Sequence, residues 1–306
     1  MPAVYGALCT YRRPGELAIM LDRLDQQTRA LDHLIVVDNA DDHAVIDLVG
    51  NHPIAKRMSL EVLGAPDNPG PAGAFAMAHK HLDATADFDD LFITFDDDDP
   101  PSSSSLIEEL CAFAETELAD GTVAGVGLRG GMLNERTGII APRPSLLSTG
   151  SGPESEIADH LHGNWFPCYR FGALQRVAGF DKGLFWGFEE LDVGRRLKAN
   201  GYSLRVASAL YRSVAPERGD SQLLGPLPAR SWRHFYRHRN LIQILRRDRA
   251  YGALAVTIVA RLILKPVLRS VTTPRLAAWH LRTNLEAIRD GFSQRPDPKH
   301  PRHLPS

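Results

Sequence analysis

Cysteine is scarce in this sequence: three residues, Cys9, Cys111 and Cys168, occur in 306. An odd number cannot form a complete disulfide framework, and none of the spacings is typical of a metal site. Because thiols stay reduced in the cytoplasm, the sequence predicts a cytoplasmic protein that does not depend on disulfide bonds. Its 43% hydrophobic content is enough for a full core.

Export and membrane-spanning signals are also missing. Residues 1–5 are strand-like and do not form a basic segment followed by an apolar one, so no export is expected. The longest apolar run, residues 253–264, contains Thr257 and Arg261 and is shorter than the ~20 residues that cross a bilayer. Pro266 is expected to break it further. We therefore expect no membrane-spanning helix.

The net charge of the chain is close to zero, but the charged residues are unevenly distributed along it. Residues 229–306 carry 16 Lys and Arg against 4 Asp and Glu, whereas residues 1–228 carry 19 against 33. No recognised nucleic-acid module accompanies the basic region, so nucleic-acid binding is not expected. Arg261, Lys265 and Arg269 recur every fourth residue, which favours a helix on the inner membrane surface facing anionic headgroups or pyrophosphate. The alternative is a helix that packs on the protein body or on another subunit, as in a homo-oligomer.

Strand-like and helix-like segments alternate in the first hundred residues. Apolar strand-like runs are predicted at residues 4–10, 33–39, 60–63 and 91–95, and helix-like segments at 15–27, 42–49 and 74–82. This alternation predicts an α/β fold with a mostly parallel sheet flanked by helices, whose ligand site lies at the carboxyl ends of the strands. We expect a catalytic domain at residues 1–228, a basic helical extension at 229–293 and a disordered tail at 294–306.

Four aspartates, Asp96 to Asp99, follow the fourth predicted strand. Crowded carboxylates repel one another unless a cation or water neutralises them, and oxygen ligands suit hard ions such as Mg²⁺ or Mn²⁺. A calcium loop of the EF-hand type is excluded, because the required Gly and final Glu are missing. The alternative is a solvated acidic turn before the Ser-rich start of the next helix.

Two further polar clusters fall at the same predicted edge of the sheet. They are residues 10–13, which include Thr10 and Arg13, and Asp38 with Asn39. Residues 68–73 precede the third predicted helix. Each has a simpler interpretation, because Asp38 could only cap a helix, Arg13 could be solvated, and residues 68–73 could only form a tight turn. The convergence of the two clusters and the aspartate run on one edge favours a shared crevice.

These motifs, in this order and spacing, resemble those of family 2 glycosyltransferases with the GT-A fold, which is Rossmann-like. Residues 179–192 resemble the block that carries the family's catalytic acid pair, and residues 195–202 resemble the helix that follows it. The segment Tyr236-Arg237-His238-Arg239-Asn240 is similar to one in the rhamnosyltransferase and galactofuranosyltransferase branch. The resemblance covers about residues 3–248.

The resemblance implies a nucleotide-sugar site. Thr10, Arg13 and Asp38 would contact the base and diphosphate, and Asn68 and Gly73 would shape the same pocket.

The resemblance also implies a metal site in the aspartate run. Asp96 and Asp98 would be the metal ligands and Asp97 would lie nearer the ribose, with Asp99 as an extra acid.

The chain departs from the family pattern where relatives often supply a metal-binding histidine. Tyr211-Arg212-Ser213 stands at that place. Three explanations stay open. Water is the third metal ligand, or His234 or His238 supplies it from further along the chain, or Arg212 neutralises part of the negative charge at the metal site.

The implied acid pair is Glu189 and Glu190. We expect Glu190 to be the catalytic base that takes the proton of the attacking hydroxyl, with Glu189 as the second candidate. Apolar neighbours such as Phe185 and Trp186 would raise the pKa of that base. The alternative is that both acids only favour the first turn of a helix beginning at Leu191.

Residues 143–178 are expected to form the acceptor side, with a flexible loop at residues 145–153. Trp165 and Asp192 are assigned to the acceptor, since an aromatic ring can stack on a sugar face. The alternative for Trp165 is an ordinary half-buried segment.

The sequence therefore predicts an inverting, metal-dependent glycosyltransferase. It would move a sugar, with galactofuranose or rhamnose favoured, from a UDP- or dTDP-sugar to a hydroxyl of a glycan or polyprenyl-linked cell-envelope precursor. A sugar-nucleotide pyrophosphatase or nucleotidyltransferase, and a noncatalytic carbohydrate-binding relative, are the alternatives.

Overall fold

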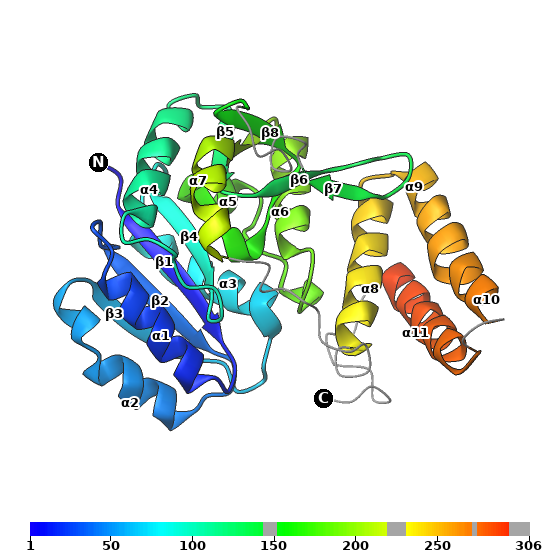
Figure 1. Cartoon of the computed structure of the whole chain (residues 1–306), viewed down its shortest axis with the longest axis horizontal. Coiled ribbons are helices and arrows are strands. Elements are labelled where there is room, and N and C mark those ends of the chain that lie inside the picture. The colour runs from blue at the N-terminus through cyan, green and yellow to red at the C-terminus, as the bar shows by residue number, and fades with distance from the viewer. Residues whose placement is uncertain (143–151, 219–230, 271–273, 294–306) are drawn as a thin grey trace. The chain divides into compact units, whose positions relative to one another are not determined.

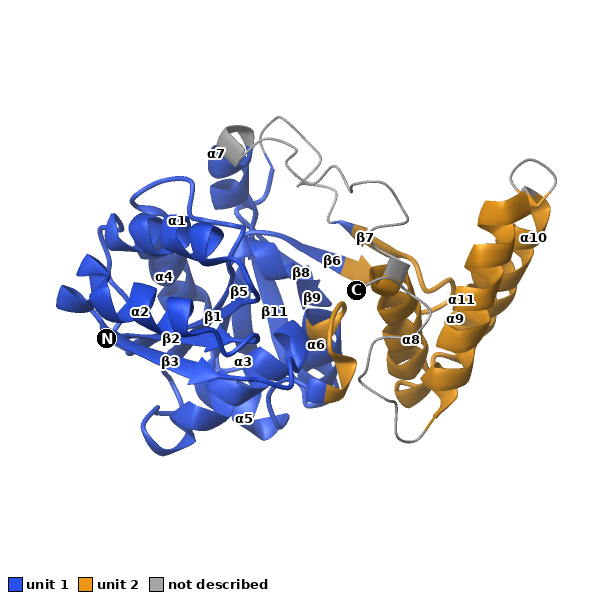
Figure 2. Cartoon of the chain, turned by 90° about the horizontal axis from the view of Figure 1, so that it is seen from below, with its two compact units in different colours: residues 1–131, 142–182, 190–221 blue, residues 132–141, 183–189, 222–306 orange. Residues whose placement is uncertain are grey.

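The computed structural model of the chain describes residues 1–142, 152–218, 231–270 and 274–293. Most of the predicted flexible loop at 145–153, and the whole of the predicted tail at 294–306, lie outside the described residues. The chain forms two compact units, coloured separately in Figure 2. We call residues 1–131, 142–182 and 190–221 the sheet unit, and residues 132–141, 183–189 and 222–306 the helical unit.

The sheet unit is built on an eight-stranded sheet with the strand order β3-β2-β1-β4-β10-β5-β11-β8. Its strands are β1 (Val4–Thr10), β2 (His33–Asp38), β3 (Ser59–Gly64), β4 (Leu91–Asp96), β5 (Val123–Gly127), β8 (Ser155–Ala158), β10 (Cys168–Arg170) and β11 (Ser203–Ala207). Strand β10 is antiparallel to β4 and β5, β8 is antiparallel to β11, and the other pairs are parallel. The mostly parallel sheet predicted from the sequence is confirmed.

Three short strands form a second sheet with the order β7-β6-β9. They are β6 (Gly130–Leu133), β7 (Ile140–Pro142) and β9 (His160–Leu161).

Helices cover both faces of the main sheet (Figure 1). They are α1 (Pro14–Asp25), α2 (His43–Asn51), α3 (Gly70–His81), α4 (Leu106–Glu117), α5 (Phe171–Arg176), α6 (Glu189–Ala199) and α7 (Ser208–Arg218), with 3₁₀ turns η1 (Pro53–Lys56), η2 (Leu82–Ala84), η4 (Gly163–Trp165) and η5 (Lys182–Leu184). Side chains alternate along each strand, so Leu8 and Val36 pack with α1, α2 and α4. Ala7 and Ile35 pack with α3, α5 and α6 on the opposite face. Burial on both faces explains the nearly continuous apolar runs of the parallel strands.

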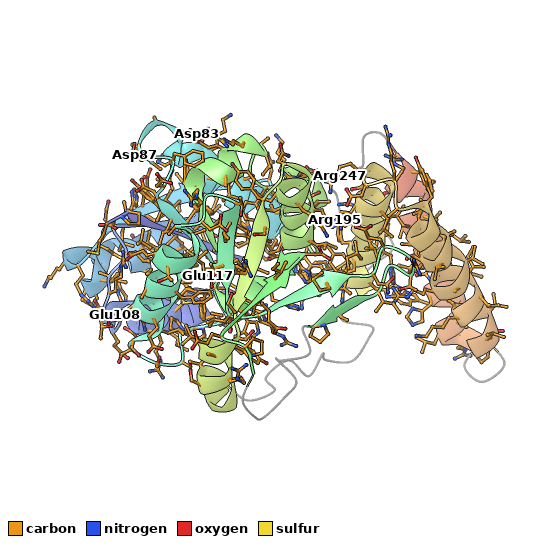
Figure 3. The ribbon with its side chains drawn as sticks, turned by 90° about the horizontal axis from the view of Figure 1, so that it is seen from above. Asp83, Asp87, Glu108, Glu117, Arg195 and Arg247 are labelled. Carbon is orange, nitrogen blue, oxygen red and sulfur yellow. The ribbon has the colours of Figure 1, made fainter. Side chains whose placement is uncertain are left out.

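Acidic side chains are spread over the sheet unit. Asp83 and Asp87 lie before the start of β4, whereas Glu108 and Glu117 lie on α4 (Figure 3). The acidic excess of residues 1–228 is therefore not a property of the aspartate run alone.

The helical unit contains α8 (Ser231–Arg247), α9 (Tyr251–Val256), the π-helical η7 (Thr257–Leu264), α10 (Lys265–Arg269) and α11 (Pro274–Phe292). The C-terminal helical extension predicted from the sequence is thus present, but this unit also includes residues 132–141 and 183–189. Buried and partly buried hydrogen bonds from α8 are part of the reason that residues 183–189 belong to this unit. Arg239 Nη2 donates to the carbonyls of Gly183 and Leu184 at 2.8 Å, and Asn240 Nδ2 donates to the Gly187 carbonyl at 2.7 Å. Buried backbone carbonyls need such partners, so α8 holds the segment that precedes α6.

The expected break at Pro266 is wrong, because helical structure continues from Tyr251 through Arg269. Proline normally clashes with the carbonyl four residues earlier, but here it follows a wider π-helical stretch, where hydrogen bonds skip five residues. The apolar helix is consequently longer than the expected 253–264. Among the described residues, Tyr251–Leu268 is long and apolar enough to be a candidate membrane span, with a mean hydropathy of 1.7, and 28% of it is buried. Core helices of soluble proteins can have the same length and mean hydropathy.

Candidate active site

The site lies where β1 and β4 run side by side (Figure 1). Thr10 ends β1 and pairs in register with Asp38 at the end of β2, and Cys9 pairs with Asp96 at the end of β4. The strand order reverses between β1 and β4, and open α/β sheets bind ligands at such a switch point. The structure therefore brings the predicted polar residues of three strands to one edge.

Asp97 is held by two side chains from the β1 end. Thr10 Oγ1 donates a 2.8 Å hydrogen bond to Asp97 Oδ2, and Arg13 Nη1 lies 3.1 Å from Asp97 Oδ1. The same Arg13 nitrogen lies 2.9 Å from Asp98 Oδ2. Burial raises the pKa of Asp97, while the hydrogen bond from Thr10 and the positive charge of Arg13 oppose that rise. Thr10 and Arg13 thus order the aspartate run, and their contacts with a nucleotide stay predictions.

Glu190 approaches the aspartate run from another element. It lies in the first turn of α6, and Gly163 lies in η4. A Cβ on Gly163 would stand 2.2 Å from Glu190 Oε1 and 3.8 Å from Asp96 Oδ2. The two carboxylates are therefore no further apart than the sum of these distances, and both face one backbone position. Sequence reasoning missed Gly163, although a glycine between polar and aromatic residues was the available signal.

The aspartate run fits a divalent cation only in part. Within the described ranges, no three His, Cys, Asp or Glu side chains are grouped to hold a metal ion. Mg²⁺ and similar ions are commonly bound by one or two carboxylates together with water and substrate phosphates. Asp96 and Asp98 supply such a pair of oxygen donors, and Arg13 currently neutralises Asp98. The donor set thus fits a cation that takes its remaining ligands from a diphosphate and water.

Asp38 has a structural role in the turn after β2. Its side chain is 1% exposed, and its Oδ1 accepts a 2.9 Å hydrogen bond from the Ala40 N–H. Its Oδ2 accepts from the Asp42 N–H, and Asp42 rather than Asp38 caps α2. Asp38 therefore shapes the loop at the predicted site, and its contact with the base stays a prediction.

Asn68 and Gly73 form the turn that begins α3. Asn68 has a φ of 46°, and its Oδ1 accepts a hydrogen bond from the Gly70 N–H at 3.3 Å. A Cβ on Gly73 would stand 2.3 Å from the Pro69 Cβ, so only glycine fits there. Residues 68–73 thus form the tight turn considered in the sequence analysis. Their role in shaping a nucleotide-sugar pocket stays a prediction.

Trp165 and Asp192 are both engaged within the sheet unit. Trp165 is 9% exposed, and the centroid of its ring lies 4.9 Å from that of Tyr211. Asp192 is 1% exposed and forms a 2.6 Å ion pair with Arg196 one turn along α6. Their assignment to the acceptor stays a prediction. Glu189, which is 6% exposed at the start of α6, stays the second candidate for the catalytic base.

Arg212, which stands where relatives often have a histidine, lies on α7. Its Nη2 donates to the carbonyls of Gly152 and Pro153 at 3.2 and 3.3 Å. His234 and His238, the other residues considered for that place, belong to the helical unit.

Solved structures support the fold. A mannosyltransferase from Pyrobaculum calidifontis, solved with GDP-mannose and Mn²⁺, matches with a TM-score of 0.53 and 17% identity over 94% of this chain and 86% of its own. GalNAc-T7, solved with UDP, GalNAc and Mn²⁺, matches with a TM-score of 0.58 and 11% identity over 97% of this chain and 58% of its own. These similarities confirm the predicted GT-A fold and carry no conclusion about substrate.

Sequence comparisons are more specific. A galactofuranosyltransferase, GlfT1, from Mycobacterium tuberculosis is 35% identical over 214 residues, which are 65% of this chain and 66% of that protein. The match thus spans slightly less than two thirds of the relative's length. The sequence model of glycosyl transferase family 2 matches residues 7–184, more than half of the chain. These residues include the end of β1 with Thr10, the whole of β4 and the aspartate run, and the chain belongs to glycosyl transferase family 2.

Proposed function

We propose that the protein is an inverting, metal-dependent glycosyltransferase acting on a UDP- or dTDP-sugar, with galactofuranose or rhamnose as the favoured sugar. The acceptor would be a hydroxyl of a glycan or of a polyprenyl-linked cell-envelope precursor. One observation carries the proposal: Glu190 and Asp96 face the same backbone position, Gly163, at the carboxyl edge of the sheet. The similarity to a galactofuranosyltransferase supports the choice of sugar.

The two carboxylates would have different roles. Glu190 accepts the proton of the acceptor hydroxyl while the hydroxyl oxygen bonds to the anomeric carbon of the donor sugar. The bond from that carbon to the diphosphate oxygen breaks at the same time. Attack from the face opposite the leaving group inverts the anomeric centre. Asp96 and Asp98 would hold Mg²⁺ or Mn²⁺, which when bound stabilises the negative charge on the leaving diphosphate. Thr10 and Arg13 keep the aspartates in place through Asp97 and Asp98.

The helical unit would bring the protein to the inner face of the cell membrane. Its apolar helix Tyr251–Leu268 and the basic residues Arg261 and Lys265 support this, since such helices bind anionic lipid surfaces. The protein would then be cytoplasmic and peripheral. A homo-oligomer in which this helix contacts a second copy is the competing arrangement.

Product analysis tests the proposed reaction. The protein is incubated with UDP-galactofuranose or dTDP-rhamnose, Mn²⁺ and a lipid-linked or glycan acceptor, and the released nucleotide is identified. Nucleoside diphosphate together with a glycosylated acceptor supports transfer, whereas nucleoside monophosphate supports a pyrophosphatase. Donor binding without turnover, detected as a rise in melting temperature, supports a noncatalytic relative.

A further inference from the structure

The helical unit contains a basic pocket that the proposed reaction does not use. It has a volume of about 250 Å³ and lies among α8, η7, α10 and α11. Its polar lining includes His234 and His238 from α8, Arg261 from η7, Lys265 from α10 and His280 from α11. All of these residues belong to the helical unit. We refer to this cavity as the basic pocket.

Among the residues that the structure describes, no carboxylate lines the basic pocket. Burial is the main reason that the pKa of His238 falls to about 3, and the neighbouring His234, Arg237, Arg261 and His280 lower it further. Burial likewise lowers the pKa of His234 to about 4. These two histidines are therefore neutral at pH 7, and the positive charge of the lining comes from Arg261 and Lys265. These two charges attract an anion and repel a cation.

A hydrogen bond to Asn284 holds one of the pocket histidines, His234. Asn284 Nδ2 donates to the Leu262 carbonyl at 2.7 Å, which leaves its Oδ1 to accept from His234 Nε2 at 2.8 Å. That contact fixes the orientation of the His234 ring. The three histidines do not form a metal site, because the described part of the chain holds no such group of three ligands.

The helix that supplies Arg261 and Lys265 also carries exposed apolar side chains. Val259 is 58% exposed, Leu264 48% and Leu268 66%. A soluble anion would use only the basic pocket and leave this apolar surface in water, which is unfavourable. A lipid phosphate would use both, because its charged group and its hydrocarbon chain are covalently joined.

We propose that the basic pocket binds the phosphate or diphosphate group of a membrane lipid, while the apolar side chains beside it enter the hydrocarbon region. Arg261 and Lys265 provide the positive charge, and His238 and His280 provide hydrogen-bond donors at the pocket wall. The inference refines the proposed membrane association and rests on that part of the proposed function. It is independent of Glu190 and the aspartate run.

Vesicle binding tests this assignment on the full chain. The vesicles contain phosphatidylcholine alone, or phosphatidylcholine with phosphatidic acid or with phosphatidylglycerol at equal surface charge. We expect binding to phosphatidic acid to be strongest, since its phosphate is a monoester that fits inside a pocket. Lys265→Gln removes the positive charge of an exposed side chain and should weaken that binding about five-fold. Arg261→Gln should weaken it by a similar factor, although it also removes a 3.2 Å hydrogen bond to the Gly138 carbonyl.

Arg289→Gln is the matched control, because Arg289 lies on α11, is not part of the basic pocket lining and is 79% exposed at its side chain. It removes the same charge and should change binding to both anionic lipids less than two-fold. Equal binding to both anionic lipids, or an equal effect of Lys265→Gln and Arg289→Gln, would overturn the pocket assignment. Binding to phosphatidylcholine alone would show apolar insertion only. Saturation by inorganic phosphate without vesicle binding would show a soluble anion site.

Nucleotide release separates this test from the proposed reaction. Lys265→Gln should keep the wild-type rate of UDP release in detergent solution, whereas Glu190→Gln should lose that rate and still bind phosphatidic acid vesicles. A variant that loses vesicle binding and keeps UDP release has a defect in the basic pocket. A variant that loses UDP release and keeps vesicle binding has a defect in the catalytic carboxylates.

Discussion

Glu190 and Asp96 approach one glycine from two different elements. Glu190 lies in the first turn of α6 and Asp96 at the end of β4, yet a Cβ on Gly163 would stand 2.2 Å from one carboxylate and 3.8 Å from the other. The main chain at Gly163 therefore sets how closely the proposed base and the proposed metal ligand approach. Any side chain at this position would enter the space between them.

Gly163→Ala should lower kcat about a hundred-fold or more, since misplacing a catalytic group by about 1 Å costs a factor of this size. The atom in conflict with the new Cβ is the end of a flexible glutamate side chain, so the fold should adapt and the melting temperature should change little. Gly50→Ala is the control, because a Cβ at Gly50 in α2 has nothing within 4 Å. Full activity of Gly163→Ala would show that Glu190 does not act from this position.

Glu190→Gln should lower kcat by about two to four orders of magnitude, because the amide cannot accept the acceptor proton. Donor affinity should stay near that of the wild type, as measured by a melting-temperature shift with the nucleotide sugar. Glu189→Gln is the companion variant, since it removes the adjacent acid of α6. If Glu189→Gln is inactive and Glu190→Gln turns over normally, the roles of the two residues are exchanged.

Asp98→Ala should abolish transfer and weaken Mn²⁺ binding in the presence of UDP, because it removes one of two proposed oxygen ligands. Titration calorimetry or the Mn²⁺ paramagnetic resonance signal measures this binding directly. Asp87→Ala removes an exposed aspartate that precedes β4 and should leave Mn²⁺ affinity unchanged. Unaltered Mn²⁺ affinity in Asp98→Ala would exclude Asp98 as a ligand.

Arg13→Gln removes a positive charge that now lies 3.1 Å from Asp97 and 2.9 Å from Asp98. Its side chain is 39% exposed, so solvent weakens both ion pairs, and we expect Mn²⁺ binding to tighten only about two- to five-fold. KM for the donor should rise at the same time, because the proposed diphosphate contact is lost. Weaker Mn²⁺ binding in this variant would contradict a competition between Arg13 and the cation.

The edge of the sheet that carries the candidate active site was predictable from the sequence, because parallel strands have their carboxyl ends at the same edge of a sheet. The apolar run at residues 4–10 matches β1 residue for residue, and the acids after residue 95 therefore had to lie beside Thr10 once β1 and β4 paired. Strand β10 was not predicted. Its three residues, Cys168–Arg170, enter the middle of the sheet antiparallel, and such pairing depends on contacts with β4 and β5 that local sequence does not encode.

Other features were missed because glycine and proline act through the backbone. Gly163 matters because it lacks a side chain beside Glu190 and Asp96, and a missing side chain produces no periodic pattern in the sequence. Pro266 was expected to break the apolar helix, but it follows a π-helical stretch. In that stretch the Leu262 carbonyl accepts a hydrogen bond from the side chain of Asn284 on another helix. Asn240 was identified by resemblance, but its hydrogen bond to the Gly187 carbonyl required the fold.

The two half-buried histidines of α8, His234 and His238, make stability sensitive to acid. The folded pKa is about 3 for His238 and about 4 for His234, both below the unfolded value of about 6.5. The unfolded chain therefore binds more protons below pH 6.5, so the contribution of these neutral rings is complete above that pH. It is lost as the pH falls toward 4 for His234 and toward 3 for His238. From pH 7 to pH 5 the expected loss in unfolding free energy is of order 1 kcal/mol for each histidine.

Denaturant unfolding at pH 7 and pH 5 measures this loss, and tryptophan fluorescence is a suitable probe because Trp186, Trp232 and Trp279 belong to the helical unit. His238→Gln should show a smaller difference between the two pH values than the wild type. His43→Gln, which changes an exposed residue at the start of α2, should show the wild-type difference. Equal pH dependence in His238→Gln and the wild type would mean that His238 is solvated and chargeable in the folded chain, because a ring that titrates alike in both states contributes nothing to the pH dependence of folding.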